Sequence, residues 1–395
     1  MIRHDRNAVG IHKKHEWGFR RLGALIFVLA VAAAFSLGAF AEWDWEPQAR
    51  SAILMEAHTG EVLFERNADE ALPPASVTKV MTLLLVMEAV DSGKISMSDQ
   101  VQVSEHAASM GGSQIFLEVG ETMTVEELVK SVVVASANDA AVALAEFTEG
   151  SEAAFVDRMN ERAAQLGMKN THFENTNGLD DNVTNHVTSA RDIAIMSAEL
   201  MRHPDIFRFT TIWQDTVRNG AFTLTNTNRL IRFYRGATGL KTGSTSKAGY
   251  CISATAERDG VSLIAVVMGS PTRDVRNAVA KQMLDYGFSR VSYYRDAGCE
   301  VGSLPVRGSC EENVTLISSD FGVLLEKGES GKVERIVEIP ESVSAPVHTG
   351  DVLGRVVYRV GDREVGTAEL TAGNDVERIG FGQLLFRIFR AFAIS

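Results

Sequence analysis

Short apolar stretches near the start of the chain predict a β-hairpin followed by several helices. Residues 52–55 and 62–64 flank the turn residues His58-Thr59-Gly60, a pattern typical of two antiparallel strands. The apolar run 80–90 then indicates a buried helix that ends near Asp91-Ser92-Gly93. Cap signals and spacing predict further helices at 124–135 (opened by a capping box), 139–147, 151–166 and 189–202.

The pattern changes after Gly236, where β-branched and small residues become frequent. Residues 249–257 and 261–268 flank Arg258-Asp259-Gly260 and predict a second hairpin. Residues 275–286 predict a helix, which Gly287 is expected to end. Because strands come from both ends of this segment and helices from its middle, residues 42–290 predict one α+β domain.

A second, smaller domain is expected at residues 291–374. Its pattern is one of short strands separated by turns such as Gly350-Asp351 and Gly361-Asp362. The expected strands are 301–306, 314–317, 333–339, 352–358 and 364–370. No cluster of Ser, His, Cys or carboxylates in this all-β segment suggests chemistry, so we expect a spacer or docking role.

The last segment, residues 375–395, has helical spacing of apolar positions together with positive charge. Its apolar positions are Ile379, Phe381, Leu384, Leu385, Ile388, Phe389 and Phe392, and its basic residues are Arg378, Arg387 and Arg390. Such an amphipathic helix suits the interface of a membrane, with arginines toward anionic headgroups. The alternative is a terminal helix that packs on the protein itself.

The first 41 residues have the layout of a secretory signal peptide. Lys13, Lys14, Arg20 and Arg21 precede an apolar run at 22–40, and cleavage is expected after Ala41. The alternative is an uncleaved anchor helix, because the apolar run is close to the length that spans a bilayer. Both interpretations place the rest of the chain outside the cytoplasm, in the periplasm or the cell-wall space.

Composition and charge narrow the class of protein. The chain has 395 residues, of which 45% are hydrophobic, and its net charge is -12. Beyond residue 41 there remain 33 basic against 49 acidic residues, a net charge of -16. An acidic body of this kind argues against nucleic acid as the main partner.

Cysteine and histidine spacing predicts no metal site. The chain has three cysteines, and none lies in a Cys/His group with the spacing of metal ligands. Cys251 falls in an apolar run and is expected to be buried. Cys299 and Cys310 could form a disulfide in an oxidising compartment or remain free thiols.

Ser76-Val77-Thr78-Lys79 is the most informative stretch for chemistry. A Ser and a Lys three residues apart share one face of a helix, and here they precede an apolar helical run. Near a helix N-terminus, free N–H groups and the dipole favour developing negative charge. A partly desolvated lysine amine can lose its proton near neutral pH and deprotonate the hydroxyl. The pattern also occurs by chance, so it predicts a catalytic Ser only together with further elements.

Two such elements follow in chain order. Ser136-Ala137-Asn138 lies between two predicted helices, where a hydroxyl can relay a proton and a carboxamide can hold the lysine; Asn138 could equally be a helix N-cap. Lys241-Thr242-Gly243, followed by Ser244, could bind a carboxylate from an edge strand, with Gly243 letting the substrate approach and a following N–H serving an oxyanion. Its alternative is a simple strand-entry turn.

The order S-x-x-K, S-x-N, K-T-G resembles the penicillin-binding protein and serine β-lactamase superfamily. Within it the chain is similar to the low-molecular-mass D-alanyl-D-alanine carboxypeptidases, peptidase family S11. The resemblance also includes the following segments: Ser51-Ala52-Ile53-Leu54-Met55, Thr59-Gly60, Asn138-Asp139-Ala140, Asn177-Gly178-Leu179, Ser189-Ala190-Arg191-Asp192 and Lys247-Ala248-Gly249-Tyr250. It implies a β-lactamase/DD-peptidase-like catalytic domain, an antiparallel sheet with a helical cluster, followed by the small all-β domain and the C-terminal helix.

The resemblance also implies a role for each site residue. Ser76 would be the acylated nucleophile and Lys79 its general base, with Ser136 and Asn138 completing the proton network. Lys241 and Thr242, with Arg276, would hold the terminal carboxylate of the substrate. Several relatives carry His where this chain has Ser244, so only a backbone role is expected there. Gly111-Gly112-Ser113-Gln114 resembles a segment that lines the cleft.

The implied activity is that of a serine-type carboxypeptidase that needs no cofactor. It would remove the terminal D-alanine from peptidoglycan stem peptides through an acyl-enzyme on Ser76, and penicillin would acylate the same residue. Three alternatives remain open: a DD-endopeptidase, a β-lactamase and a catalytically silent wall-binding protein. The chain lacks the E-x-x-L-N segment of class A β-lactamases, and its intact motifs argue against the silent protein.

Overall fold

A computed structural model describes residues 45–389 except 182, 384 and 387–388. The expected signal peptide therefore lies outside the described residues. The expected α+β domain contains a five-stranded antiparallel sheet in the order β2-β1-β9-β8-β7. Its strands are β1 (Ser51–Glu56), β2 (Val62–Arg66), β7 (Ala237–Thr245), β8 (Gly249–Arg258) and β9 (Val261–Ser270). The predicted pairing of strands from both ends of the segment is confirmed.

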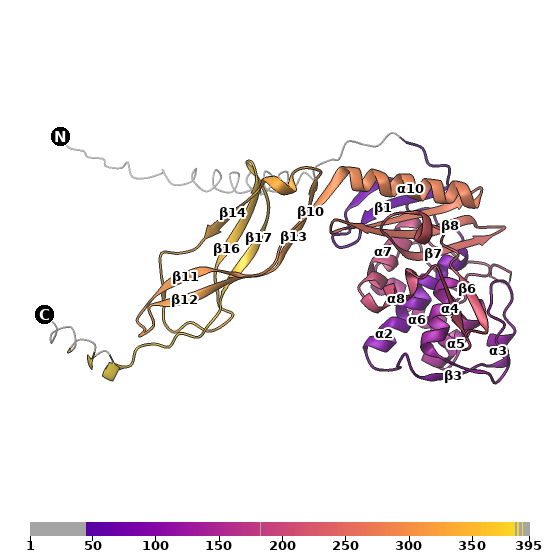
Figure 1. The fold of residues 1–395 in the computed structure, drawn as a ribbon, viewed down its shortest axis with the longest axis horizontal. Coiled ribbons are helices and arrows are strands. Elements are labelled where there is room, and N and C mark those ends of the chain that lie inside the picture. Colours follow the sequence, from indigo (N-terminus) through magenta and orange to yellow (C-terminus); the bar gives the residue numbers. More distant parts are fainter. Residues whose placement is uncertain (1–44, 182, 384, 387–388, 390–395) are drawn as a thin grey trace, which may run out of the picture. The chain divides into compact units, whose positions relative to one another are not determined.

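The sheet is covered on both faces, which is why its central strands are buried throughout. Successive residues of a strand point to opposite faces, so Ile53 and Met55 of β1 join the core shared with the helical cluster. Helix α10 (Arg273–Arg290) packs on one face, and α7 (Ala190–Met201) with the other helices lies on the opposite face (Figure 1).

Three helices of the cluster begin at the cap residues that the sequence predicts. Thr124 and Glu127 form a capping box, and Ser151 and Ser189 accept N–H groups at their helix starts. The remaining helical elements are η1 (Ala75–Thr78), α2 (Lys79–Asp91), α3 (Glu105–Ala108), α4 (Val125–Val134), α5 (Asn138–Glu149), α6 (Glu152–Gln165), η2 (Pro204–Ile206), α8 (Phe207–Thr210) and α9 (Leu230–Phe233). Two short ribbons pair β3 (Gln100–Gln102) with β4 (Thr122–Thr124) and β5 (Gln214–Val217) with β6 (Phe222–Thr225).

The prediction that Gly287 ends the last helix is wrong. Helix α10 continues through it to Arg290. A Cβ built at Gly287 would lie 2.6 Å from a methyl carbon of Leu263 and 3.1 Å from one of Leu54. The missing side chain therefore lets the helix approach the sheet closely, and it does not terminate the helix.

The second domain is all-β, as predicted. Six strands form a sheet in the order β14-β16-β17-β12-β11-β15, and β10 pairs with β13 in a separate ribbon. Its elements are β10 (Val291–Asp296), β11 (Glu300–Arg307), β12 (Asn313–Ser318), β13 (Phe321–Glu326), η3 (Ser330–Lys332), β14 (Val333–Glu338), β15 (Val343–Ser344), β16 (Val352–Val360) and β17 (Arg363–Ala372). The short clusters around Leu316 and Tyr358 form its core. Cys299 and Cys310 are free and exposed, and Cys251 is buried as expected.

Only part of the expected C-terminal helix falls in described residues. Val376 forms a bridge with Val347, and the N–H of Ile379 donates to Gly308, so these positions belong to the β domain. Helical conformation begins at Phe381, which is strongly exposed together with Phe386 and Phe389. No helix in the described part of the chain is long and apolar enough to cross a bilayer. The membrane-binding helix stays a prediction.

Candidate active site

Ser76 and Lys79 lie where η1 leads into α2, so that both side chains reach the same point. Lys79 is fully buried, and its Nζ donates to Ser76 Oγ at 3.0 Å. The same amine donates to Asn138 Oδ1 at 2.6 Å and to the carbonyl of Asn177 at 2.7 Å. Three acceptors from three separate chain segments therefore fix the amine beside the hydroxyl.

The surroundings of Lys79 favour its uncharged form. Burial lowers the pKa of the amine well below its ordinary value, and the positive charge of Lys241 lowers it further, while Asp139 opposes both. In its uncharged form the amine has two N–H groups, enough for Asn138 Oδ1 and the carbonyl of Asn177, and its lone pair can accept the proton of the Ser76 hydroxyl. The pair thus meets the geometric and electrostatic requirements for an activated nucleophile.

Ser136 lies in the connection between α4 and α5, as the sequence predicts, and Asn138 is the first residue of α5. Ser136 is almost fully buried and has φ +64°, a left-handed conformation that is uncommon for non-glycine residues. The alternative role of Asn138 as a helix N-cap is wrong, because Ala137 holds that position and Asn138 Nδ2 donates to the carbonyl of Gly111. Within the described residues, Lys79 makes no hydrogen bond to Ser136.

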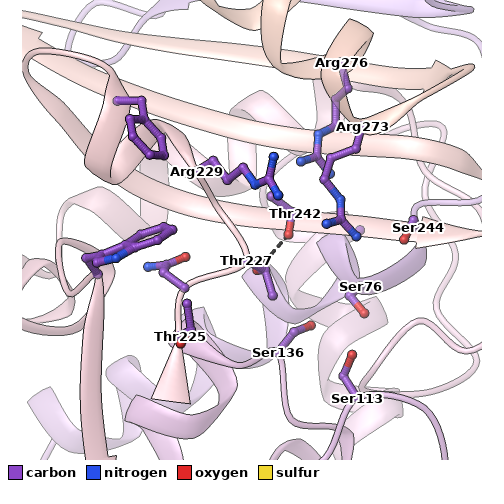
Figure 2. A pocket seen from close by; sticks show the side chains of 14 residues that line it. Ser76, Ser113, Ser136, Thr225, Thr227, Arg229, Thr242, Ser244, Arg273 and Arg276 are labelled. Atoms are coloured by element: carbon purple, nitrogen blue, oxygen red, sulfur yellow. Dashed lines mark hydrogen bonds between the residues drawn. The ribbon is translucent and has the colours of Figure 1, made fainter. Parts of the chain in front are cut away.

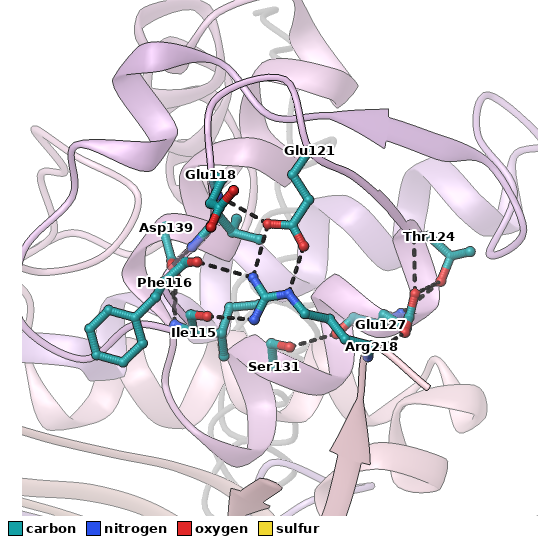
Figure 3. Close-up of polar contacts among 10 residues, drawn as sticks. Ile115, Phe116, Glu118, Glu121, Thr124, Glu127, Ser131, Asp139 and Arg218 are labelled. Carbon is teal, nitrogen blue, oxygen red and sulfur yellow. Dashed lines mark hydrogen bonds and ion pairs between the residues drawn. The ribbon is translucent and has the colours of Figure 1, made fainter. Parts of the chain in front are cut away.

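The segment 111–117 is held against this connection from two sides. The carboxylate of Asp139 accepts the N–H groups of Ile115 and Leu117. From the β5–β6 turn, the guanidinium of Arg218 donates to the carbonyls of Ile115 and Phe116 and pairs with Glu121 (Figure 3). The expectation that Gly111–Gln114 lines the cleft holds for Ser113, which faces it.

Lys241, Thr242 and Gly243 lie on β7, the edge strand of the sheet, and not in a strand-entry turn. Lys241 is buried, and its Nζ donates only to the carbonyl of Thr242, at 3.0 Å, among the described residues. Burial and the positive charge of Arg276 lower the pKa of Lys241 to about 7. The hydroxyl of Thr242 donates to Thr227 Oγ1 at 2.8 Å.

Gly243 also permits a close approach within the protein, in addition to the approach of substrate that the sequence predicts. A Cβ at this position would lie 2.8 Å from both the carbonyl of Pro74 and the amide nitrogen of Ser76. The glycine therefore permits the close approach of η1 to the edge strand, which brings Ser76 beside β7. Ser244, the next residue, is exposed and lines the cleft.

These residues surround a cleft of about 630 Å³. Figure 2 shows Ser76, Ser113 and Ser136 on one side, Arg229, Arg273 and Arg276 on the other, and Thr242 between them. Arg276 is buried, and its guanidinium also donates to the carbonyl of Cys251. Burial and the charges of Arg273 and Arg229 lower the pKa of Arg276 to about 10. The described lining contains no Asp or Glu, so this side of the cleft favours an anion.

The structure brings together all nine predicted site residues, although Lys79, Asn138 and Lys241 lie beneath the cleft surface. Reasoning from the sequence missed Thr227, Trp213, Arg229 and Arg273, which come from loops and helix starts without a motif. It also missed the backbone acceptor at Asn177. That residue belongs to a segment quoted for the family resemblance, which was the only available signal.

Comparison with known proteins decides the family. The model of the D-alanyl-D-alanine carboxypeptidase family, peptidase S11, matches residues 39–272, and that of the penicillin-binding protein 5 C-terminal domain matches residues 293–378. The chain belongs to the S11 family of D-alanyl-D-alanine carboxypeptidases. It is 42% identical over 383 residues to the D-alanyl-D-alanine carboxypeptidase DacF of Bacillus subtilis, covering 93% of this chain and 97% of that relative.

Solved structures agree with this assignment. Penicillin-binding protein 5 of Haemophilus influenzae has a TM-score of 0.70 and 33% identity, covering 86% of this chain and 100% of that one. Penicillin-binding protein D2 of Listeria monocytogenes, in its cefotaxime-bound form, has a TM-score of 0.58 and 33% identity, covering 62% of this chain and 100% of that one. The expected fold, family and activity class of this S11 member are therefore confirmed.

Proposed function

We propose that this D-alanyl-D-alanine carboxypeptidase removes the terminal D-alanine of peptidoglycan stem peptides through an acyl-enzyme on Ser76. The observation that carries the proposal is the buried Lys79 amine, 3.0 Å from Ser76 Oγ and lowered in pKa. In acylation the free amine takes the hydroxyl proton while Ser76 Oγ attacks the carbonyl between the two D-alanines.

The remaining steps use the same groups. The C–N bond of the tetrahedral intermediate breaks, and the leaving amine of D-alanine receives its proton through the Ser136 hydroxyl. Water then attacks the ester carbon, and its proton passes back toward Lys79 as the Ser76 oxygen leaves. The backbone N–H groups of Ser76 and Ser244 would hold the oxyanion in both steps, and Asn138 would keep Lys79 in place.

Recognition of the substrate is assigned to the opposite side of the cleft. Lys241, Thr242 and Arg276 would bind the terminal carboxylate, supported by the lack of acidic residues in the described lining. A β-lactam presents both a carboxylate and a strained carbonyl, so we expect penicillin to acylate Ser76 by the same route. The Listeria protein D2 with cefotaxime bound supports this expectation.

The setting of the enzyme is proposed from the sequence. Residues 1–41 would be a signal peptide, 42–290 the catalytic domain, 291–374 the β domain and 375–395 a helix in the membrane interface. The protein would then act at the outer face of the cytoplasmic membrane. The exposed apolar side chains of Phe381, Phe386 and Phe389 support the last assignment.

The test is D-alanine release from a pentapeptide ending in D-Ala-D-Ala, with Ser76→Ala as the control. We expect release by the wild type, no release by the variant and a fluorescent penicillin label on Ser76 alone. Rapid multiple turnover of penicillin would favour a β-lactamase, and preferential cleavage of cross-linked dimers a DD-endopeptidase. A wild type that neither releases D-alanine nor takes the label would indicate a silent wall-binding protein.

A further inference from the structure

A buried chain of hydrogen bonds connects His186 to the peptide bond that precedes Ser76. The backbone N–H of Glu174 donates to His186 Nδ1 at 2.9 Å. The neutral ring therefore carries its proton on Nε2, which lies 2.8 Å from Thr78 Oγ1. The Thr78 hydroxyl in turn donates to the carbonyl of Ala75 at 2.8 Å. Each group donates once in this arrangement, so its direction is determined.

The chain is sealed from solvent and uncharged. Thr78 is completely buried, and His186 is 5% exposed. Burial lowers the pKa of His186 to about 4, although Glu174 opposes the shift, and His172 adds to it. The ring is therefore neutral at neutral pH and keeps the Nε2–H that Thr78 requires. None of the proposed catalytic steps uses either residue.

The carbonyl at the end of this chain belongs to a residue with an unusual backbone. Ala75 has φ +50°, the left-handed region that alanine rarely adopts. Gly178 leaves room for that carbonyl, because a Cβ there would lie 1.9 Å from the Ala75 oxygen and 2.8 Å from Thr78 Oγ1. The surrounding structure thus selects one orientation of the Ala75–Ser76 peptide unit.

That orientation determines where the N–H of Ser76 points. In a planar trans peptide the carbonyl and the following N–H point in opposite directions. A carbonyl held toward Thr78 therefore directs the Ser76 N–H away from Thr78. Gly243 of β7 lies close to this nitrogen, since a Cβ there would be 2.8 Å from it. The N–H thus lies next to the strand that continues to Ser244, the other proposed oxyanion donor.

We infer that Thr78 and His186 are positioning residues that orient the Ser76 N–H as a donor to the oxyanion. The inference rests on the proposed role of Ser76 as nucleophile. An oxyanion donor acts on the transition state more than on the bound substrate. Loss of its alignment therefore lowers kcat while KM changes little, and it slows acylation and deacylation together because both steps pass through a tetrahedral oxyanion.

The test compares two matched pairs of variants in the full-length protein. Thr78→Val removes the hydroxyl and keeps the shape, whereas Thr78→Ser keeps the hydroxyl. His186→Leu removes both ring nitrogens, whereas His186→Gln retains a donor at the position of Nε2. The readouts are kcat and KM for the pentapeptide, the rates of acylation and deacylation by a fluorescent penicillin, and the melting temperature. Rates are normalised to the sites that penicillin titrates, so that only folded enzyme is counted.

For Thr78→Val and His186→Leu we expect kcat and both penicillin rates to fall by on the order of 10- to 100-fold, since removal of a whole oxyanion donor costs about 100- to 1000-fold. KM should stay within about twofold, and Thr78→Ser and His186→Gln should recover most of the rate. A lower melting temperature with unchanged rates per titrated site would overturn the inference, as would a rise in KM at constant kcat. If Thr78→Val does not fold, the His186 pair decides by the same readouts. A wild type without label on Ser76 would instead overturn the proposed function.

Discussion

The two sides of the cleft each bury a lysine, but they surround it differently. On the helical side, Lys79 donates to a hydroxyl, a carboxamide and a backbone carbonyl. On the sheet side, Lys241 donates, within the described part of the chain, only to the neighbouring carbonyl of Thr242, and it lies close to the positive charge of Arg276. Both amines have lowered pKa values, and burial is the largest cause in each case.

The difference teaches how one residue type can take two roles. Burial and the positive charge of Lys241 favour the neutral form of Lys79 over the opposing charge of Asp139, and a neutral amine can act as a base. An amine next to a guanidinium, with hydrogen-bonding capacity unused, gains most when an anion arrives. We therefore assign proton transfer to the helical side and carboxylate recognition to the sheet side, and the predictions below test that division.

The largest effect is expected for Lys79→Met on the helical side. Methionine keeps a long unbranched side chain but cannot accept a proton, so acylation by penicillin should fall by about a thousandfold. Non-covalent binding of a peptide ending in a free carboxylate should change little, because the sheet side is intact. Stopped-flow acylation and a competition assay measure the two effects. Acylation of the variant at the wild-type rate would exclude Lys79 as the base.

The sheet side should show the opposite kinetic signature. In Arg276→Gln the guanidinium is lost, and a hydrogen bond between charged groups contributes about 1.5 to 3 kcal/mol. We therefore expect KM for the pentapeptide to rise by roughly 10- to 100-fold with a much smaller change in kcat. A pentapeptide with an amidated C-terminus is the control, since it should lose little from the substitution. An equal rise in KM for the pentapeptide with a free C-terminal carboxylate and for the amidated one would show that Arg276 does not bind the carboxylate.

The sequence predicted the local parts of this arrangement well. Alternating and helical patterns gave the hairpin β1–β2, the helix α2 and the pair β8–β9, and cap residues gave the helix starts at Thr124, Ser151 and Ser189. Ribbon strands β10 and β13 were missed because their side chains are only partly buried, so the alternation that marks a strand is weak. The prediction at Gly287 was wrong because the sequence does not distinguish a glycine that permits close packing from one that ends a helix.

The candidate site shows the same limit. Three motifs identified Ser76, Asn138 and Lys241. They could not predict hydrogen-bond partners that use backbone atoms or that lie far away in the sequence. The carbonyl of Asn177 and the ring of His186 lie about a hundred residues from Lys79 and Thr78, at 98 and 108 positions. Backbone carbonyls carry no residue signature, so only the fold reveals such contacts.

The pH dependence of substrate binding should distinguish the two lysines further. Burial and the positive charge of Arg276 lower the pKa of Lys241 to about 7, so its amine is cationic below pH 7 and largely neutral above it. A bound carboxylate favours the cation, and binding above pH 7 therefore takes up a proton. We expect KM to rise with pH above 7, by up to about tenfold per unit. The variant Lys241→Gln should lose this rise, and a wild-type KM that is constant between pH 6 and 9 would contradict it.

The smallest effect is expected in the β domain, whose described residues bury no charged side chain. Tyr358 Oη donates to Asp296 Oδ2 at 2.7 Å, and Asp296 also pairs with Arg335. Tyr358→Phe should therefore lower the free energy of unfolding by about 1.5 kcal/mol without leaving the carboxylate unpaired. The matched control is Tyr234→Phe in the catalytic region, where Oη donates to Asp285 at the same distance.

Neither tyrosine lines the described cleft, so both variants should be acylated by penicillin within about twofold of the wild-type rate while their urea midpoints fall. The informative quantity is the acylation rate of Tyr358→Phe at constant temperature, well below its unfolding transition. A tenfold change there would mean that the packing of the β domain reaches the groups around Ser76. The β domain would then influence catalysis as well as the two sides of the cleft. The prediction that this domain is only a spacer or docking domain would have to be abandoned.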